Sequence, residues 1–139
     1  MLNSQGFVLD PRLENDSTWV CDLALSQLRI INDSQFKWFI LVPRKNGLRE
    51  IIDLTEVEQI DLLQESAKLS KVLQDLYQPH KLNIAAIGNV VAQLHLHHIC
   101  RYEHDVAWPS PVWGKQAMRP YNDDEKQAII LQVRAALFY

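Results

Sequence analysis

The sequence predicts an α+β fold, and three observations support that prediction. Short apolar runs bounded by turn residues fill the first third of the chain and return after position 80, which is typical of β-strands. Between these regions, residues 55–77 repeat apolar side chains at helical spacing. A second helical pattern ends the chain after a stretch that contains several prolines. Strands and helices segregated in this way favour an antiparallel sheet covered by helices.

The first strands are predicted from three apolar runs. These runs cover residues 19–25, 28–31 and 38–42, and Pro43 ends the last of them. The Asn-Asp-Ser sequence at 32–34 supplies turn residues whose side chains can bond their own backbone, which favours a reversal of the chain there. Antiparallel pairing of the flanking strands follows from such a reversal.

The long helix is predicted to start at a capping box. Thr55 and Glu58 have the spacing at which each side chain can accept a hydrogen bond from the other residue's backbone N–H. The apolar stripe then continues to Tyr77, and Pro79 ends it. We expect this helix to cover one face of the sheet.

The second half of the chain is predicted to return to strands. Residues 81–87 and 93–101 have strand character, and the Gly88-Asn89 pair between them is a turn signal. Segment 102–121 is expected to be irregular, because prolines and a glycine interrupt it. A terminal helix is predicted over 122–139, with Asn122 as its N-cap.

Composition limits the class of protein. The chain has 139 residues, of which 47% are hydrophobic, and we expect one domain over 1–139. The formal net charge of −3 disfavours duplex nucleic acid as a partner. No run is long enough to cross a membrane, and the first ten residues lack the pattern of a secretory leader. The 2 cysteines are far apart and are expected to be small buried residues. A cytoplasmic protein is therefore expected.

The chemistry of the sequence is concentrated in residues 93–99, Gln-Leu-His-Leu-His-His-Ile, which hold three of the 5 histidines. Because side chains alternate along a strand, Gln93, His95 and His97 are expected on one face. His98 and the two leucines are expected on the other face, against a helix, and His98 is predicted to be a hydrogen-bonded buried residue. The imidazole face is expected to be open to a ligand.

These residue types favour phosphate chemistry. An imidazole is a competent nucleophile at neutral pH, and a phosphoryl or nucleotidyl group is a natural acceptor. A neighbouring imidazole can donate to a phosphate oxygen. Gly88 and Asn89, just before the strand, add flexible backbone and a side-chain amide that could reach the same phosphate.

Residues 88–97 resemble the signature of the histidine triad family, in which a glycine, an amide and a spacer precede alternating histidines. The resemblance covers about 28–101 and implies a homodimer with a five-stranded antiparallel sheet and two main helices. It implies a nucleotide-binding enzyme that hydrolyses or transfers a nucleoside phosphate ester, anhydride or phosphoramidate, such as a dinucleoside polyphosphate, through a nucleotidyl-histidine intermediate. No cofactor or metal is implied.

The resemblance also assigns roles to individual residues. His95 corresponds to the nucleophile and His97 to the histidine that contacts phosphate. Asn89, with Gly88 before it, corresponds to the loop amide that helps to hold phosphate. Asn32 corresponds to the asparagine near the ribose.

The chain departs from the family pattern at several positions. Gln93 stands where the first histidine of the triad belongs, so the set is Gln-x-His-x-His-His. The turn after Asn32 is short, and His98 occupies a position that is usually apolar. Residues 107–114 resemble a bacterial branch of the family, and the two tryptophans in this segment, Trp108 and Trp113, could border a nucleotide site, form a dimer contact or pack the tail.

Two alternative functions remain open at the level of the sequence. Gln93 could mark a catalytically weak nucleotide-binding or regulatory protein that keeps the pocket. Two imidazoles at i and i+2 on a strand could also chelate zinc, with His104 or Glu103 as a third ligand, but no established zinc spacing supports this.

Overall fold

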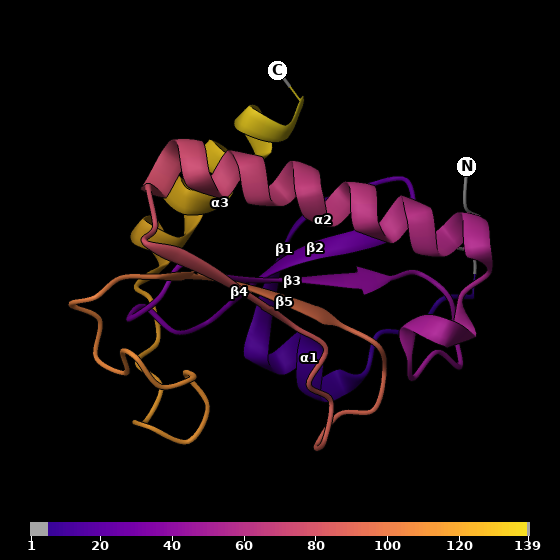
Figure 1. Ribbon diagram of the computed structural model, residues 1–139, viewed down its shortest axis with the longest axis horizontal. Coiled ribbons are helices and arrows are strands. Elements are labelled where there is room, and N and C mark those ends of the chain that lie inside the picture. The colour runs from indigo at the N-terminus through magenta and orange to yellow at the C-terminus, as the bar shows by residue number, and fades with distance from the viewer. Residues whose placement is uncertain (1–5, 139) are drawn as a thin grey trace.

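The computed structural model of the chain describes residues 6–138 (Figure 1). Its elements are α1 (Pro11–Asp16), β1 (Ser17–Asp22), β2 (Ser26–Ile31), β3 (Trp38–Pro43), the 3₁₀ helix η1 (Ile51–Asp53), α2 (Glu56–Tyr77), β4 (Lys81–Ala85), β5 (Leu96–Arg101) and α3 (Asp123–Phe138). The strands form one five-stranded antiparallel sheet in the order β1-β2-β3-β5-β4. The α+β prediction, with two main helices α2 and α3, is confirmed.

The sheet has two differently covered faces. On one, which we call the α2 face, α2 and α3 pack over the sheet and form the larger hydrophobic core (Figure 1). On the other, the α1 face, a smaller apolar cluster joins Leu13 of α1 to Trp38, Ile40 and Ile99 of the central strands. The two faces therefore have separate cores, and alternate residues of β5 contribute to each.

The caps predicted for the two main helices are present. Thr55 Oγ1 accepts from Glu58 N at 3.2 Å, and Glu58 Oε1 accepts from Thr55 N at 3.0 Å. Asn122 Oδ1 accepts from Glu125 N at 2.8 Å at the start of α3. The last residue of the predicted terminal helix, Tyr139, lies outside the described residues.

Several predicted strand limits were wrong. The strand expected over 93–101 begins only at Leu96, and the one expected over 81–87 ends at Ala85. Both limits have the same cause: the ladder between β4 and β5 ends where Ala85 pairs with His97, and the ladder between β3 and β5 ends at Leu96. Residues 93–95 therefore lead into the sheet without belonging to it.

The short helix α1 was not predicted from the sequence. Asp10 accepts from Arg12 N at 2.8 Å as the N-cap, and Pro11 occupies the first turn. An Asp-Pro pair is a known helix start, so the signal was present. The strand predicted from residue 19 instead begins at Ser17, directly after this helix, and ends at Asp22.

The segment between β5 and α3 has no helix or strand over residues 102–122. It is fixed by a buried ion pair in which Arg101 Nε lies 2.9 Å from Asp105 Oδ2, and these side chains are 1% and 5% exposed. Asp105 also accepts from the backbone N–H groups of Tyr102, Ala107 and Trp108. Ala107 and Val112 thereby join the apolar cluster of the α1 face.

Candidate active site

The two histidines proposed for chemistry are neighbours on the α1 face. His97 is paired within the sheet, opposite Ile40 of β3 and Ala85 of β4, and His95 directly precedes β5. Their ring centroids are 4.8 Å apart with an interplanar angle of 68°. The chain therefore brings His95 and His97 into edge contact.

The ring of His95 has its proton fixed at one nitrogen. Nδ1 lies 2.7 Å from the backbone carbonyl oxygen of Gln93, which only accepts, so Nδ1 carries the proton and donates it. Nε2 is then the nitrogen with the lone pair. Burial lowers the pKa of His95, and the nearby Asp10 carboxylate opposes this to a smaller extent. The neutral imidazole with a free Nε2 is the form that acts as a nucleophile.

His97 is held at both ring nitrogens. Trp38 Nε1 donates to its Nδ1 at 2.9 Å, so the proton of His97 is on Nε2, which lies 3.3 Å from the carbonyl oxygen of Ile87. Burial, with help from His95, lowers the pKa of His97 to about 4. Trp113 packs edge-on against the same ring at 4.9 Å. His97 is thus a neutral, oriented N–H donor.

Gln93 contributes its main chain and its side chain to different partners. Its carbonyl orients His95, as described above. Its side-chain amide extends to the N-terminal segment, where Oε1 accepts from Asp10 N at 2.8 Å and Nε2 donates to Val8 O at 2.9 Å. The side chain therefore clamps residues 8–10 beside the histidines.

The loop before β5 turns back against His95. A Cβ atom on Gly88 would lie 2.6 Å from Val91 O and 3.8 Å from His95 Cε1, so only glycine fits this approach. Asn89 follows with an exposed side chain. Both residues therefore lie in the loop next to the imidazole.

Asn32 directly follows β2. Its Oδ1 accepts from Tyr121 N at 3.0 Å, and its backbone N–H donates to Asp16 O at 3.0 Å. Within residues 6–138, none of the hydrogen bonds of Asn32 reaches either histidine. Its structural contact is with the segment that leads into α3.

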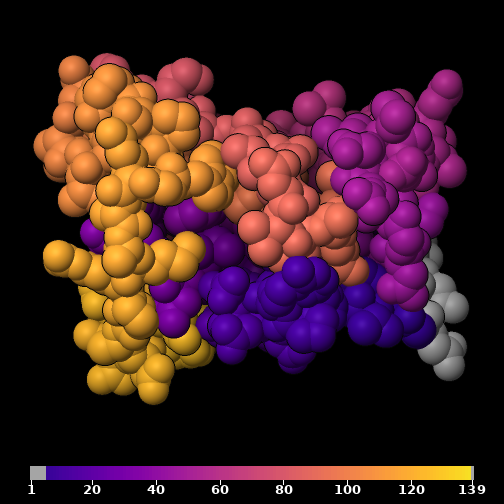
Figure 2. Space-filling model, turned by 90° about the horizontal axis from the view of Figure 1, so that it is seen from below, coloured from indigo at the N-terminus to yellow at the C-terminus, as the bar shows by residue number. Residues whose placement is uncertain are grey.

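The expectation of an open imidazole face was wrong. His95 and His97 are only 6% and 5% exposed, because α1, the N-terminal segment and the segment after β5 cover this side of the sheet. Figure 2 shows the molecule from this side, with α1 in indigo, the loop before β5 in salmon and the segment after β5 in orange to yellow. A hollow remains between these three parts, and purple atoms from the region of β2 and β3 form its floor.

His98 lies on the opposite, α2 face, as predicted. Its Nδ1 donates to Leu96 O at 3.1 Å, so its Nε2 accepts from Ser66 Oγ of α2 at 2.7 Å. The ring is fully buried, and burial lowers its pKa to about 4. The prediction of a buried, hydrogen-bonded histidine is confirmed.

The residues considered for a zinc site have other contacts. His97 has protein partners at both ring nitrogens. Glu103 Oε1 lies 3.6 Å from His80 Nδ1, and the ring of His104 stacks on Tyr102. Across residues 6–138, no group of three or more His, Cys, Asp or Glu side chains is placed to hold a metal ion.

Three side chains near the histidines were not predicted from the sequence. These are Asp10 and Arg12 from the N-terminal segment, and Trp38 beside His97. Trp38 could have been found, because alternation along β3 places it on the same face as Ile40, the partner of His97. Of the two tryptophans left open, Trp113 contacts His97, whereas Trp108 packs on the guanidinium of Arg101.

Comparison with known proteins is consistent with this geometry. The sequence profile of the HIT domain matches residues 12–104. A histidine triad protein from Sinorhizobium meliloti 1021 superposes with a TM-score of 0.94 at 36% identity, covering 96% of this chain and 99% of that one. A histidine triad protein from Bradyrhizobium japonicum gives 0.93 at 41% identity, covering 95% and 98%. One from Marinobacter aquaeolei VT8 gives 0.92 at 43% identity, covering 94% and 96%. No curated protein matches the sequence.

Proposed function

The chain belongs to the histidine triad (HIT) family, and on that premise we propose that it is a nucleotide-binding hydrolase or transferase whose nucleophile is His95. The observation that carries this proposal is the ring of His95. Its Nδ1–H is fixed by the Gln93 carbonyl, its Nε2 is unprotonated, and the glycine loop lies against its Cε1 side. Family membership supports the general kind of activity, and this geometry supports the assignment of the attacking atom.

The proposed reaction has two balanced steps. Nε2 of His95 forms a bond to the α-phosphorus while the bond to the leaving group breaks, and the leaving group keeps the electron pair. A phosphate leaving group departs as the anion, whereas a nitrogen leaving group also takes one proton from solvent and departs as the amine. Water then attacks the same phosphorus, the P–N bond breaks, and one proton passes to solvent. A nucleoside monophosphate and the neutral imidazole result; a second acceptor in place of water makes the reaction a transfer.

The neighbouring groups are proposed to hold the reacting phosphate. His97 can exchange its long 3.3 Å hydrogen bond to Ile87 O for a bond to a phosphate oxygen. Gly88 and Asn89 bring backbone and a side-chain amide to the same phosphate. Asn32 is proposed to lie near the ribose, with Nδ2 as its donor, since Oδ1 already accepts from Tyr121 N.

Gln93 is compatible with catalysis in this scheme. The group that orients His95 is the Gln93 backbone carbonyl, which any residue at this position supplies. Gln93 in place of the first triad histidine therefore removes imidazole chemistry at this position but keeps the carbonyl that orients His95. The alternative is a regulatory nucleotide-binding protein with weak catalysis. The Gln93 side chain favours it, because both polar groups of its amide are hydrogen-bonded to residues 8–10.

Turnover and binding distinguish these two functions. The wild type, His95→Ala and the control His80→Ala would be assayed for release of nucleoside monophosphate from a dinucleoside polyphosphate and a nucleoside phosphoramidate. We expect His95→Ala to lower the rate by about a thousand-fold or more while nucleotide binding persists, and His80→Ala to match the wild type. Full activity of His95→Ala would exclude the nucleophile assignment. Nucleotide binding by a wild type that turns over neither substrate would establish the regulatory alternative.

We further propose a homodimer that forms through β4 and the first half of α2. β4 is an edge strand, so one side of its backbone has no partner strand within residues 6–138. Beside it, Ile84, Ile60 and Leu63 are 47%, 56% and 69% exposed. Such exposure of large apolar side chains next to a free edge favours a protein contact.

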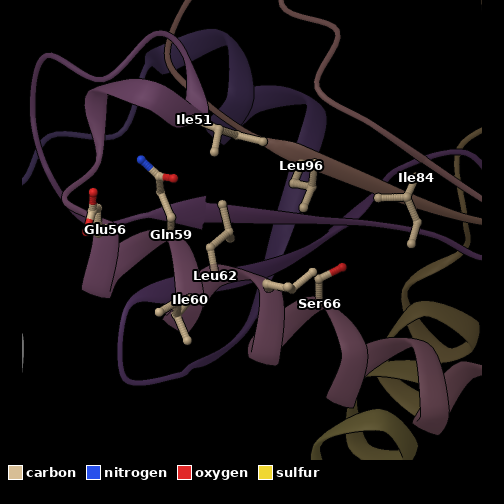
Figure 3. Close-up of a pocket in the computed structure, with 9 residues that line it drawn as sticks. Ile51, Glu56, Gln59, Ile60, Leu62, Ser66, Ile84 and Leu96 are labelled. Atoms are coloured by element: carbon tan, nitrogen blue, oxygen red, sulfur yellow. The ribbon is translucent and has the colours of Figure 1, made fainter.

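The same region is hollowed. A groove of about 760 Å³ lies between η1, α2 and the β4–β5 edge. Figure 3 shows Leu62 and Ser66 of α2 on one side of it and Leu96 and Ile84 on the other. We propose that a second copy of the chain covers this groove. The surface is on the α2 face, away from His95.

A bacterial source and a cytoplasmic location are also part of the proposal. The three similar structures come from bacteria. Among the helices that the structure describes, none has both the length and the apolar character needed to span a membrane.

A further inference from the structure

Arg12 ties α1 to the loop beside His95. Its Nε and Nη2 donate to the two carboxylate oxygens of Asp10 at 3.1 and 2.9 Å. Its Nη1 donates to the carbonyl oxygen of Val90 at 3.0 Å. Val90 directly follows Asn89, so the guanidinium is fixed to the loop proposed to hold phosphate.

The hydrogen bonds of the Gln93 side-chain amide fix the position of the segment that carries Arg12. This amide holds Val8 O and Asp10 N, so the residues just before Arg12 are bound to the residues just before His95. Asp10 is close enough to His95 for its carboxylate to raise the pKa of the imidazole, against the larger effect of burial. Arg12 is therefore linked to the surroundings of the imidazole through Asp10 and through the loop at Val90.

The guanidinium has donors left for a ligand. Of the five N–H groups that an arginine carries, three are used in the contacts above, and one remains on each of Nη1 and Nη2. The side chain is 57% exposed, whereas His95 is 6% exposed. Among described residues, no other basic side chain bonds the backbone of residues 88–92. Arg12 is thus the cation at the outer side of this loop.

Resting on the proposed function, we propose that Arg12 binds the phosphates of the leaving group when the substrate is a nucleoside polyphosphate. The α-phosphorus must reach Nε2 of the buried His95, so a chain of further phosphates extends outward, toward the more exposed guanidinium. When the P–O bond to the leaving group breaks, its electron pair stays on the bridging oxygen. Arg12 then stabilises an anion whose charge has increased.

This role predicts selectivity by leaving group. A dinucleoside polyphosphate releases a polyphosphate anion, whereas a nucleoside phosphoramidate releases an amine that carries no phosphate. Arg12→Gln should lower kcat/KM for the first substrate by about ten- to a hundred-fold, the usual contribution of a charged hydrogen bond, and leave the second nearly unchanged. Arg12→Lys, which keeps the charge but not the fork, should recover part of the loss.

The control is Lys71→Gln, which removes one positive charge from an exposed position on α2, where Lys71 is 73% exposed. It should leave both substrates unaffected. An equal loss for both substrates with Arg12→Gln would show that Arg12 only braces the loop, and no loss for the polyphosphate would also overturn the proposal.

Binding separates this inference from the proposed function. If the wild type turns over neither substrate, the enzyme proposal fails, and affinities for a nucleoside diphosphate and a nucleoside monophosphate then test Arg12 by calorimetry. Selective loss of diphosphate affinity in Arg12→Gln supports the contact. Equal affinities in wild type and Arg12→Gln overturn it.

Discussion

At the scale of single residues, the site depends on where two protons are held. The Gln93 carbonyl keeps the proton of His95 on Nδ1, and Trp38 keeps the proton of His97 on Nε2. Burial lowers the pKa of both rings, so both stay neutral at pH 7 without a carboxylate partner. One ring therefore offers a lone pair and its neighbour offers an N–H.

Substitution of Gln93 separates its two roles. Gln93→Ala removes two hydrogen bonds to residues 8–10 but keeps the carbonyl that orients His95. We expect the free energy of unfolding to fall by about 1–3 kcal/mol, measured by urea denaturation. The ring nitrogens of His95, observed by NMR, should keep the proton on Nδ1. A change of tautomer in Gln93→Ala would contradict the assignment of this role to the main chain.

At the scale of elements, β5 connects the site to the helical core. Its alternation places His97 on the α1 face and His98 on the α2 face, where Ser66 of α2 donates to His98. Glu65, the preceding helix residue, accepts from the backbone N–H groups of Leu25, just before β2, and Ser26, the first residue of β2. Polar contacts thus fix α2 to the sheet at β2 and at β5, in addition to its apolar packing.

The buried histidines predict a loss of stability in acid. His97 and His98 have pKa values of about 4 in the folded chain against an ordinary 6.5, so the unfolded chain binds protons that the folded chain does not. Stability should therefore fall as the pH drops from about 6.5 toward 4, on the order of 3 kcal/mol for each ring at the lower limit.

The variant His98→Leu tests this prediction without touching the α1 face. It should reduce the fall in unfolding free energy between pH 7 and pH 4.5 by less than half, because His97 and His95, whose pKa values burial also lowers, still contribute. Ser66 can turn its hydroxyl to its own helix, as Ser70 does when it donates to Ser66 O. Urea denaturation at the two pH values measures the difference. An unchanged pH dependence would show that His98 does not keep a depressed pKa.

At the scale of the whole molecule, the two faces have different proposed uses. The α1 face holds the histidines beneath α1 and the segment after β5. The α2 face carries the exposed apolar residues beside β4. Catalysis and dimer formation are therefore assigned to opposite sides of one sheet.

The dimer proposal predicts that one substitution halves the mass of the particle in solution. Leu63→Glu places a charge in the proposed interface and should convert the dimer to a monomer in sedimentation velocity. Leu131→Glu is the matched control, since Leu131 is also a half-exposed leucine, at 52%, but lies on α3. A monomeric wild type, or dissociation by the control alone, would contradict the proposed interface.

Much of the fold could be predicted from local patterns. The capping box of α2, the N-cap of α3 and the apolar runs of β2 and β3 depend on residues close in sequence, and the structure has these elements near the predicted positions. Strand limits were less predictable, because β4 and β5 end where their partners end.

The candidate site was predictable in part for the same reason. The positions of His97 and His98 on opposite faces follow from alternation along β5, and His95, just before the strand, contacts His97. The partners of the Gln93 amide, by contrast, lie 83 and 85 residues away, and only the folded chain brings them together. The covering of the histidine face was missed because α1 and the segment after β5 arrive from both ends of the chain.

The central claim is that Nε2 of His95 forms a bond to phosphorus, and intact-mass spectrometry after rapid mixing with a nucleoside phosphoramidate tests it most directly. The proposal predicts a transient mass increase equal to one nucleotidyl group, located at His95 by fragmentation and absent from His95→Ala. Formation of product without any adduct under conditions that trap phosphohistidine, or an adduct at another residue, would contradict it.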